Sequence, residues 1–105
     1  MTFIDTRQLP VIERKLGWRG RYFDSANMTF GHYDFDAGAT IHGHSHEQEE
    51  VWHVVEGKLE VTIAGATQIA GPGCVVIVPP NTQHEVRAIT AGKAIVVDYP
   101  LRKMT

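Results

Sequence analysis

Short β-prone runs separated by turn residues constrain the fold of this chain more than any other feature. From Gly20 onward, runs rich in Val, Ile, Thr, Tyr and Phe alternate with Gly and Pro, as in MTFGHYDF, EVWHVVEG, CVVIVPP and AIVVDYP. No segment carries the i, i+3, i+4, i+7 apolar stripe of a helix. The sequence therefore predicts an all-β fold, a sandwich or a closed barrel, which are architectures that leave few strand edges exposed.

Length and composition indicate one domain. A chain of 105 residues can bury one core but is too short for two, and 43% hydrophobic with 21% charged residues is ordinary globular composition. We predict a single domain over residues 1–105. Residues 1–19 would form an extended N-terminal arm with room for one strand and one short turn, and residues 20–100 would form the barrel.

Charge and apolar patterning exclude several classes of partner. The net charge is −2, and Lys and Arg are scattered from Arg7 to Lys103, so there is no basic patch for nucleic acid. The longest apolar runs are too short to span a bilayer, and the opening MTFIDTRQLP lacks the pattern of a signal peptide. We expect a cytoplasmic protein that binds neither nucleic acid nor membrane. The single cysteine, Cys74, is expected to be a small buried packing group.

Four of the six histidines fall within twelve residues, in the segment GATIHGHSHEQEEVWHVVEG. Alternate side chains of a strand share a face, so His42, His44 and His46 would project from the same face. Imidazoles that point into a barrel need polar partners, and a metal ion would supply one bond to each. The alternative is a solvated polar strand that binds nothing.

Two spaced motifs surround these histidines. Gly38, His44, His46, Glu50 and Gly57 fit the spacing G-x5-H-x-H-x3-E-x6-G. The second motif, which lies close to G-x5-P-x-G-x2-H-x3-N, comprises Gly73, Pro79, Asn81 in place of the second Gly, His84, and Ala88 in place of the last Asn. Together they resemble the two motifs of the cupin superfamily, whose members are small double-stranded β-helix barrels of the jelly-roll type.

The resemblance implies a metal site formed by His44, His46, Glu50 and His84, with one or two coordination positions open. It extends from Gly38 to Ala88, about half of the chain. Three imidazoles and a carboxylate suit one divalent transition metal ion, namely Fe, Mn, Ni, Zn, Co or Cu. Open coordination positions are typical of a catalytic metal rather than a structural one.

A second register leads to a different ligand set. The substring HGHSHEQ also resembles the HSHPHEQ of small cupins of uronate-sugar degradation, which implies His42, His44 and Gln48 as ligands. The distances to Gly38 and Gly57 favour the first register. In that register His42 lies one step above the ligands on the inward face, where it would transfer protons or hold a ligand by hydrogen bonding.

Three further residues have a placement or a role to be tested. His53 has the opposite parity to Glu50 and is expected to point away from the metal, whereas parity leaves His32 unplaced. The ending VVDYPLR resembles the final strand of the uronate-degradation cupins, D-x-F followed by Pro and Arg, although the Arg comes earlier here. This likeness implies an acid/base role for Asp98, and the alternative is a strand-end carboxylate that meets a turn.

These observations predict a metal-dependent enzyme that acts on a small oxygen-rich organic substrate by dioxygenase or by isomerase or lyase chemistry, with His42 and Asp98 as proton-transfer groups. A non-catalytic module that binds a metal or a sugar, such as a sensor, is the alternative. A purely structural metal ion is the least favoured alternative, because a barrel of this length can build a core without one. We also expect a homodimer in which the N-terminal arm and outward Val, Tyr and Trp side chains cover a partner barrel.

Overall fold

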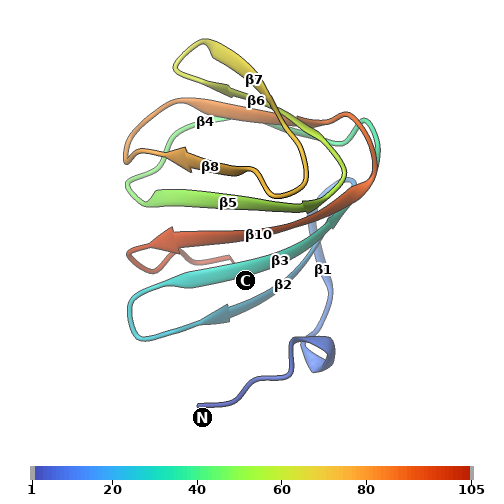
Figure 1. The fold of residues 1–105 in the computed structure, drawn as a ribbon. Coiled ribbons are helices and arrows are strands. Elements are labelled where there is room, and N and C mark those ends of the chain that lie inside the picture. The colour runs from blue at the N-terminus through green and yellow to red at the C-terminus, as the bar shows by residue number, and fades with distance from the viewer. Residues whose placement is uncertain (1, 105) are drawn as a thin grey trace.

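The computed structural model describes residues 2–104, and its strands form two antiparallel sheets that pack face to face (Figure 1). The six-stranded sheet has the order β1 (Ile12–Lys15), β2 (Trp18–Asp24), β3 (Thr29–Phe35), β10 (Gly92–Tyr99), β5 (Glu49–Glu56), β8 (Val75–Val78). The four-stranded sheet has the order β4 (Thr40–His44), β9 (His84–Ala88), β6 (Leu59–Ile63), β7 (Ala66–Ala70). The chain crosses repeatedly between the sheets, and the predicted all-β jelly-roll fold is confirmed.

Helical structure within residues 2–104 is limited to one 3-10 turn, η1 (Thr6–Gln8), which precedes β1. None of the described helical residues forms a segment long and apolar enough to cross a bilayer. Within the range expected to form the N-terminal arm, the structure contains η1, β1 and the first two residues of β2. Trp18, the first residue of β2, is already part of the hydrophobic core.

The core fills one end of the space between the sheets. Alternation along β5 buries Trp52 and Val54, and the register of β10 places Ala94 opposite Val54. Trp18 packs with Phe35 and Trp52 at ring-centroid distances of 5.3 and 5.9 Å. Further along the same strands the buried residues become polar, so the opposite end of the barrel is left for the histidines and carboxylates.

Gly57 sets the turn between β5 and β6. Its φ is +81°, a conformation that L side chains rarely adopt, and a Cβ at this position would collide with the carbonyl oxygen of Ala91. Asn81 also has a positive φ, 57°, in the turn that leads to β9. The glycine of the second motif can be replaced by Asn here because Asn tolerates the left-handed region better than other non-glycine residues.

The structure overturns the expectation for Cys74. The residue is exposed, because it lies in the turn that precedes β8 rather than inside the apolar run that follows it.

Candidate metal centre

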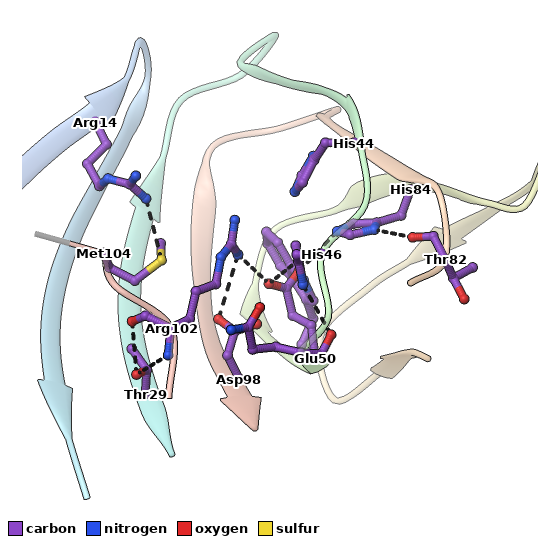
Figure 2. Close-up of polar contacts among 12 residues, drawn as sticks. Arg14, Thr29, His44, His46, Glu50, Thr82, His84, Asp98, Arg102 and Met104 are labelled. Atoms are coloured by element: carbon purple, nitrogen blue, oxygen red, sulfur yellow. Dashed lines mark hydrogen bonds and ion pairs between the residues drawn. The ribbon is translucent and has the colours of Figure 1, made fainter. Parts of the chain in front are cut away.

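Three histidines meet where β4 and β9 pair and the chain enters β5. His44 ends β4 and is the cross-strand partner of His84, the first residue of β9. His46 reaches the same point from the loop before β5 (Figure 2). The ring centroids of His44 and His84 are 4.3 Å apart, and those of His46 are 5.3 Å from His44 and 5.0 Å from His84.

Each of these rings is oriented by a backbone carbonyl. The Nδ1 atoms lie 2.8 to 3.1 Å from carbonyl oxygens: His44 pairs with His42, His46 with Gln48, and His84 with Thr82. A carbonyl oxygen can only accept, so each Nδ1 carries a proton and donates it. In a neutral imidazole this arrangement leaves the Nε2 lone pair free for a metal ion, which is how ligand histidines are commonly oriented.

Glu50 completes the donor set from β5. Its Oε2 lies 3.4 Å from His46 Nε2, and its Oε1 lies 3.5 Å from His84 Nε2. Both Nε2 atoms are buried without a hydrogen-bond partner among residues 2–104. A lone pair that faces a carboxylate oxygen is unfavourable unless a proton or a cation lies between them. One ring nitrogen from each of the three histidines lies within 4.8 Å of the other two, and the Glu50 carboxylate lies beside them. This donor set therefore fits a divalent transition metal ion.

Two other side chains hold the Glu50 carboxylate. Trp52 Nε1 donates a hydrogen bond to Oε1 at 2.6 Å, and Arg102 Nη1 donates to Oε2 at 3.0 Å. Burial by itself would raise the pKa of Glu50, but the imidazoles of His46 and His84 that face its carboxylate, together with Asp98 and the hydrogen bond from Trp52, hold this pKa well below its usual range. Glu50 is therefore ionised, as a metal ligand must be.

Asp98 lies directly across from Glu50, because the two residues are Cα partners in the pairing of β5 with β10. Its Oδ1 is buried without a hydrogen-bond partner in the described part of the chain, and its Oδ2 lies 3.8 Å from Arg102 Nη1. Burial, and then the neighbouring Glu50 carboxylate, raise the pKa of Asp98 well above its usual range. The pair thus combines one ionised and one protonated carboxyl group.

A pocket opens beside His44 and Glu50. Its walls are largely aromatic and aliphatic, formed by Trp18, Tyr22, Tyr33, Ile41, Trp52 and Val96. Three basic residues, Arg14, Lys15 and Arg102, also line it. The pocket has a volume of about 50 Å³ and combines apolar walls with positive charge.

Two glycines make room for the tyrosines of this pocket. A Cβ on Gly20 would lie 2.5 Å from Tyr22 Cζ, and a Cβ on Gly31 would lie 2.7 Å from Tyr33 Cε2. Sequence reasoning missed these tyrosines as site residues. An alignment of β2 with β3 as a hairpin would have indicated them, because it pairs Gly20 with Tyr33 and Gly31 with Tyr22.

The C-terminal segment places Arg102 in the site (Figure 2). The backbone N–H of Arg102 donates to Thr29 Oγ1 at 2.9 Å, and that hydroxyl lies 3.1 Å from the Arg102 carbonyl oxygen. Gln48 Nε2 donates to the carbonyl oxygen of Leu101 at 3.1 Å. No role was predicted for Arg102 from the sequence, although the Arg in VVDYPLR was the available signal.

The structure does not bring His42 to the cluster. The pairing of β4 with β9 is irregular between Ile41 and His44, so both of these residues face inward although they are three positions apart. His42 is exposed and lines a surface groove with Lys15. The alternation predicted for this segment is therefore wrong at His42, because a bulge interrupts it.

The remaining predicted residues lie as follows. Gln48, of the second register, is buried, but its amide is engaged with Leu101 as described above. His53 is exposed and lies on the opposite face of β5 from Glu50, as its parity predicts. His32 is half-buried on the outer face of β3, with its ring centroid 5.6 Å from that of Phe23.

Comparison with known proteins gives consistent results. The family model described as "Cupin domain" matches residues 31–99. The chain is 32% identical over 79 residues to the uncharacterized protein SCO3923 of Streptomyces coelicolor, and the match covers 75% of each chain.

Two solved structures resemble the chain along nearly its whole length. An RmlC-like cupin from Shewanella frigidimarina has a TM-score of 0.91 at 25% identity, covering 98% of this chain and 94% of that one. KdgF from Halomonas sp. has a TM-score of 0.89 at 22% identity, covering 98% of this chain and 96% of that one. At 22% identity the likeness to KdgF is evidence for the fold alone.

Proposed function

This chain belongs to the cupin domain family, and from that membership we propose that it is a metal-dependent enzyme acting on a small oxygen-rich organic acid. The observation that carries the proposal is the position of Asp98, a buried carboxyl group directly opposite Glu50 and beside the histidine cluster. A centre that only holds a metal has no need of a second buried carboxyl group at this cost in desolvation.

His44, His46, His84 and Glu50 would hold the metal ion. The oriented imidazoles and the ionised carboxylate supply a donor set that suits Fe, Mn, Ni, Zn, Co or Cu as divalent ions. A divalent ion bound there would act as a Lewis acid toward a carbonyl or enolate oxygen of the substrate. Trp52 and Arg102 would keep the Glu50 carboxylate in its orientation through their hydrogen bonds.

Residues outside the ligand set have roles of their own. Asp98, protonated near neutral pH, would deliver a proton from Oδ2 or Oδ1 and take one back in the next half of the reaction. Arg14, Lys15 and Arg102 would bind the carboxylate of the substrate, because guanidinium and ammonium groups pair with anions. The aromatic walls would exclude water from the reacting end.

Proton transfer at an enolisable carbon, as in an isomerase or a lyase, is the reaction class that this arrangement favours. It uses Asp98 directly and needs no oxidant. Dioxygenation is the second candidate, supported by the largely apolar walls of the pocket, which favour a nonpolar gas over water. The predicted role of His42 gains no support from its exposed position.

Turnover by defined metal forms of the protein would test the proposal. Protein loaded separately with Fe(II), Mn(II), Ni(II) and Zn(II) should be screened against keto acids, uronates and phenolic acids, with and without O2. We expect product from at least one combination, and Asp98→Asn should lower its rate about 100-fold to 10,000-fold with unchanged metal content. His42→Ala is the control and should leave the rate within a few-fold of wild type.

If the protein is a sensor, we expect ligand binding without turnover. Saturable binding of such acids to the metal-loaded protein, with no product from any metal form, would favour a binding module. Equal turnover by the Asp98→Asn protein would remove Asp98 from the mechanism.

A further inference from the structure

A groove on the outer face of the six-stranded sheet, on the side away from the histidine cluster, collects basic side chains. Its volume is about 210 Å³, below the roughly 300–1,000 Å³ of pockets for drug-sized molecules, so it suits a small ligand. The groove crosses β2, β3 and β10, which are neighbours in the sheet, and Thr6 of η1 also lines it. Its charged residues and its histidine are Arg21, His32, Asp34 and Lys93.

Arg21 and His32 are cross-strand partners in this groove. Arg21 Nε is buried without a hydrogen-bond partner among residues 2–104. Burial, and then the positive charge of Arg21, lower the pKa of His32. A buried donor without an acceptor is unfavourable, and here it lies beside a second group whose protonation its charge opposes. An anion placed between the two side chains would relieve both effects.

The acidic residue of the groove is already engaged. Asp34 Oδ1 lies 2.8 Å from Lys93 Nζ, so these two charges offset each other. Arg19 provides a contrast, because it lies two residues before Arg21 on the same strand and pairs with both carboxylate oxygens of Asp36, at 2.9 and 3.0 Å. The groove is therefore left with one positive charge in excess, and a proton on its histidine would add a second.

We propose that this groove binds a phosphate group, either free inorganic phosphate or the phosphate of a small monoester. Arg21, His32 and Lys93 donate to the phosphate oxygens, and the Thr6 hydroxyl donates from η1. Donors on four different elements reach a ligand from different directions, which suits a tetrahedral oxyanion better than the two coplanar oxygens of a carboxylate. A phosphate carries more than one negative charge near neutral pH, so it offsets Arg21 and favours the protonated form of His32.

Phosphate titration of the full chain, followed by nuclear magnetic resonance at constant ionic strength, tests the proposal. A chelator keeps the protein metal-free, because phosphate also binds metal ions. Inorganic phosphate should shift the ring signals of His32 along a saturation curve that the ring signals of His44 do not follow. Acetate should bind at least about tenfold more weakly, because it reaches fewer of the donors. Methyl phosphate identifies the source: binding at least as tight as that of inorganic phosphate indicates a monoester, and weaker binding indicates the free ion.

Three substitutions assign the binding to the groove. Arg21→Gln should raise the dissociation constant for phosphate about 10-fold to 100-fold, because it removes a charged donor. Arg87→Gln is the matched control, since it removes the same charge from β9 in the four-stranded sheet, where Arg87 pairs with Glu60. It should leave the constant within about threefold of wild type. Asp34→Asn should instead lower the constant several-fold, because it frees Lys93 and removes a negative charge beside the anion.

Several results would overturn the phosphate site. One is the absence of a saturable shift at His32 with about 50 mM phosphate, a concentration that fills even a millimolar site. Saturation at His44 instead would place the anion in the pocket beside the histidine cluster. Equal weakening by Arg21→Gln and Arg87→Gln would indicate a general effect of charge, and acetate binding as tight as phosphate would exclude selection of a tetrahedral oxyanion. Thermal unfolding establishes that each variant folds, and if Arg21→Gln does not, unchanged or weaker binding by Asp34→Asn contradicts the proposal.

Discussion

Glu50 and Asp98 face each other across β5 and β10, and each is only 3% exposed. Two carboxyl groups this close in a buried site do not both ionise, because the repulsion adds to the cost of desolvation. The hydrogen bonds from Trp52 and Arg102 go to Glu50, which therefore holds the charge. Asp98 holds the proton, and this division is what makes one residue suited to bind a metal and the other to transfer a proton.

The first prediction concerns stability and pH in the metal-free protein. The pKa of Asp98 is raised in the folded protein. Its protonated form therefore stabilises the fold fully below the pKa of the unfolded chain, near 3.9. This stabilisation is lost as pH rises through the pKa of the folded protein. The free energy of unfolding of wild type, minus that of Asp98→Asn, should therefore fall with rising pH, by at most about 1.4 kcal/mol per pH unit. Urea denaturation in a chelator at pH 5, 7 and 9 measures it, and a constant difference would contradict the assignment.

The second prediction concerns the metal ligands. His84→Ala should sharply lower the metal content of the purified protein, because His84 Nε2 faces the cluster and Nδ1 is already occupied by Thr82. His46→Ala and His44→Ala should do the same. His53→Ala is the matched control, since His53 is exposed on the outer face of β5. Elemental analysis by mass spectrometry gives the stoichiometry, and full metal content in the His84→Ala protein would refute the ligand set.

The third prediction concerns the pH dependence of metal binding. Burial is the main cause that lowers the pKa of His44. Burial also acts to lower the pKa of His84, but the combined effects of Glu50 and the Thr82 carbonyl raise it above its usual value. Metal binding requires neutral imidazoles, so protons compete with the metal and His84 protonates before His44 as pH falls. Affinity should drop about tenfold or more per pH unit below about pH 6. Equilibrium dialysis with Zn(II) between pH 5 and 8 measures this, and a flat profile would argue against imidazole ligands.

Much of the fold and most of the cluster were predictable from the sequence, because both depend on local patterns. Strand alternation predicts that Glu50 and Trp52 share the inward face of β5 and that His53 does not, and the structure agrees. The resemblance to the cupin motifs implies that His44 and His84 belong to one site, and they are cross-strand partners in the structure. Turn residues such as Gly57 marked the ends of strands.

What could not be predicted depends on register and on contacts between distant segments. His42 was placed on the wrong face because the bulge after Ile41 is a property of the pairing with β9, and one strand read by itself cannot reveal it. Arg102 reaches Glu50 only because the C-terminal segment is tied to Thr29, a contact 73 residues apart in the chain. The sequence identifies Asp98 as a candidate acid/base residue through the likeness of VVDYPLR to other cupins. Its burial opposite Glu50 could not be predicted without knowing that β10 pairs with β5.

The last prediction concerns the glycines beneath the pocket. A Cβ on Gly31 would lie 2.7 Å from Tyr33 Cε2, a distance that real side chains do not tolerate, so something must shift. Tyr33 has little freedom to yield, because it stacks on Trp52 at 6.2 Å and meets Trp18 edge-on at 6.3 Å. Gly31→Ala should therefore cost about 1–3 kcal/mol of unfolding free energy, as overpacking typically does.

Gly71→Ala is the matched control, because a Cβ there meets nothing within 4 Å and the backbone needs no positive φ. Its free energy of unfolding should stay within about 0.5 kcal/mol of wild type. Urea denaturation compares the two variants, and near-ultraviolet circular dichroism reports whether the aromatic wall has moved. The metal content of the Gly31→Ala protein should be unchanged, since the three atoms nearest to its Cβ belong to the rings of Tyr33 and Tyr22. If both glycine variants unfold at the same urea concentration, the tyrosine wall is looser than its packing against Trp18 and Trp52 indicates.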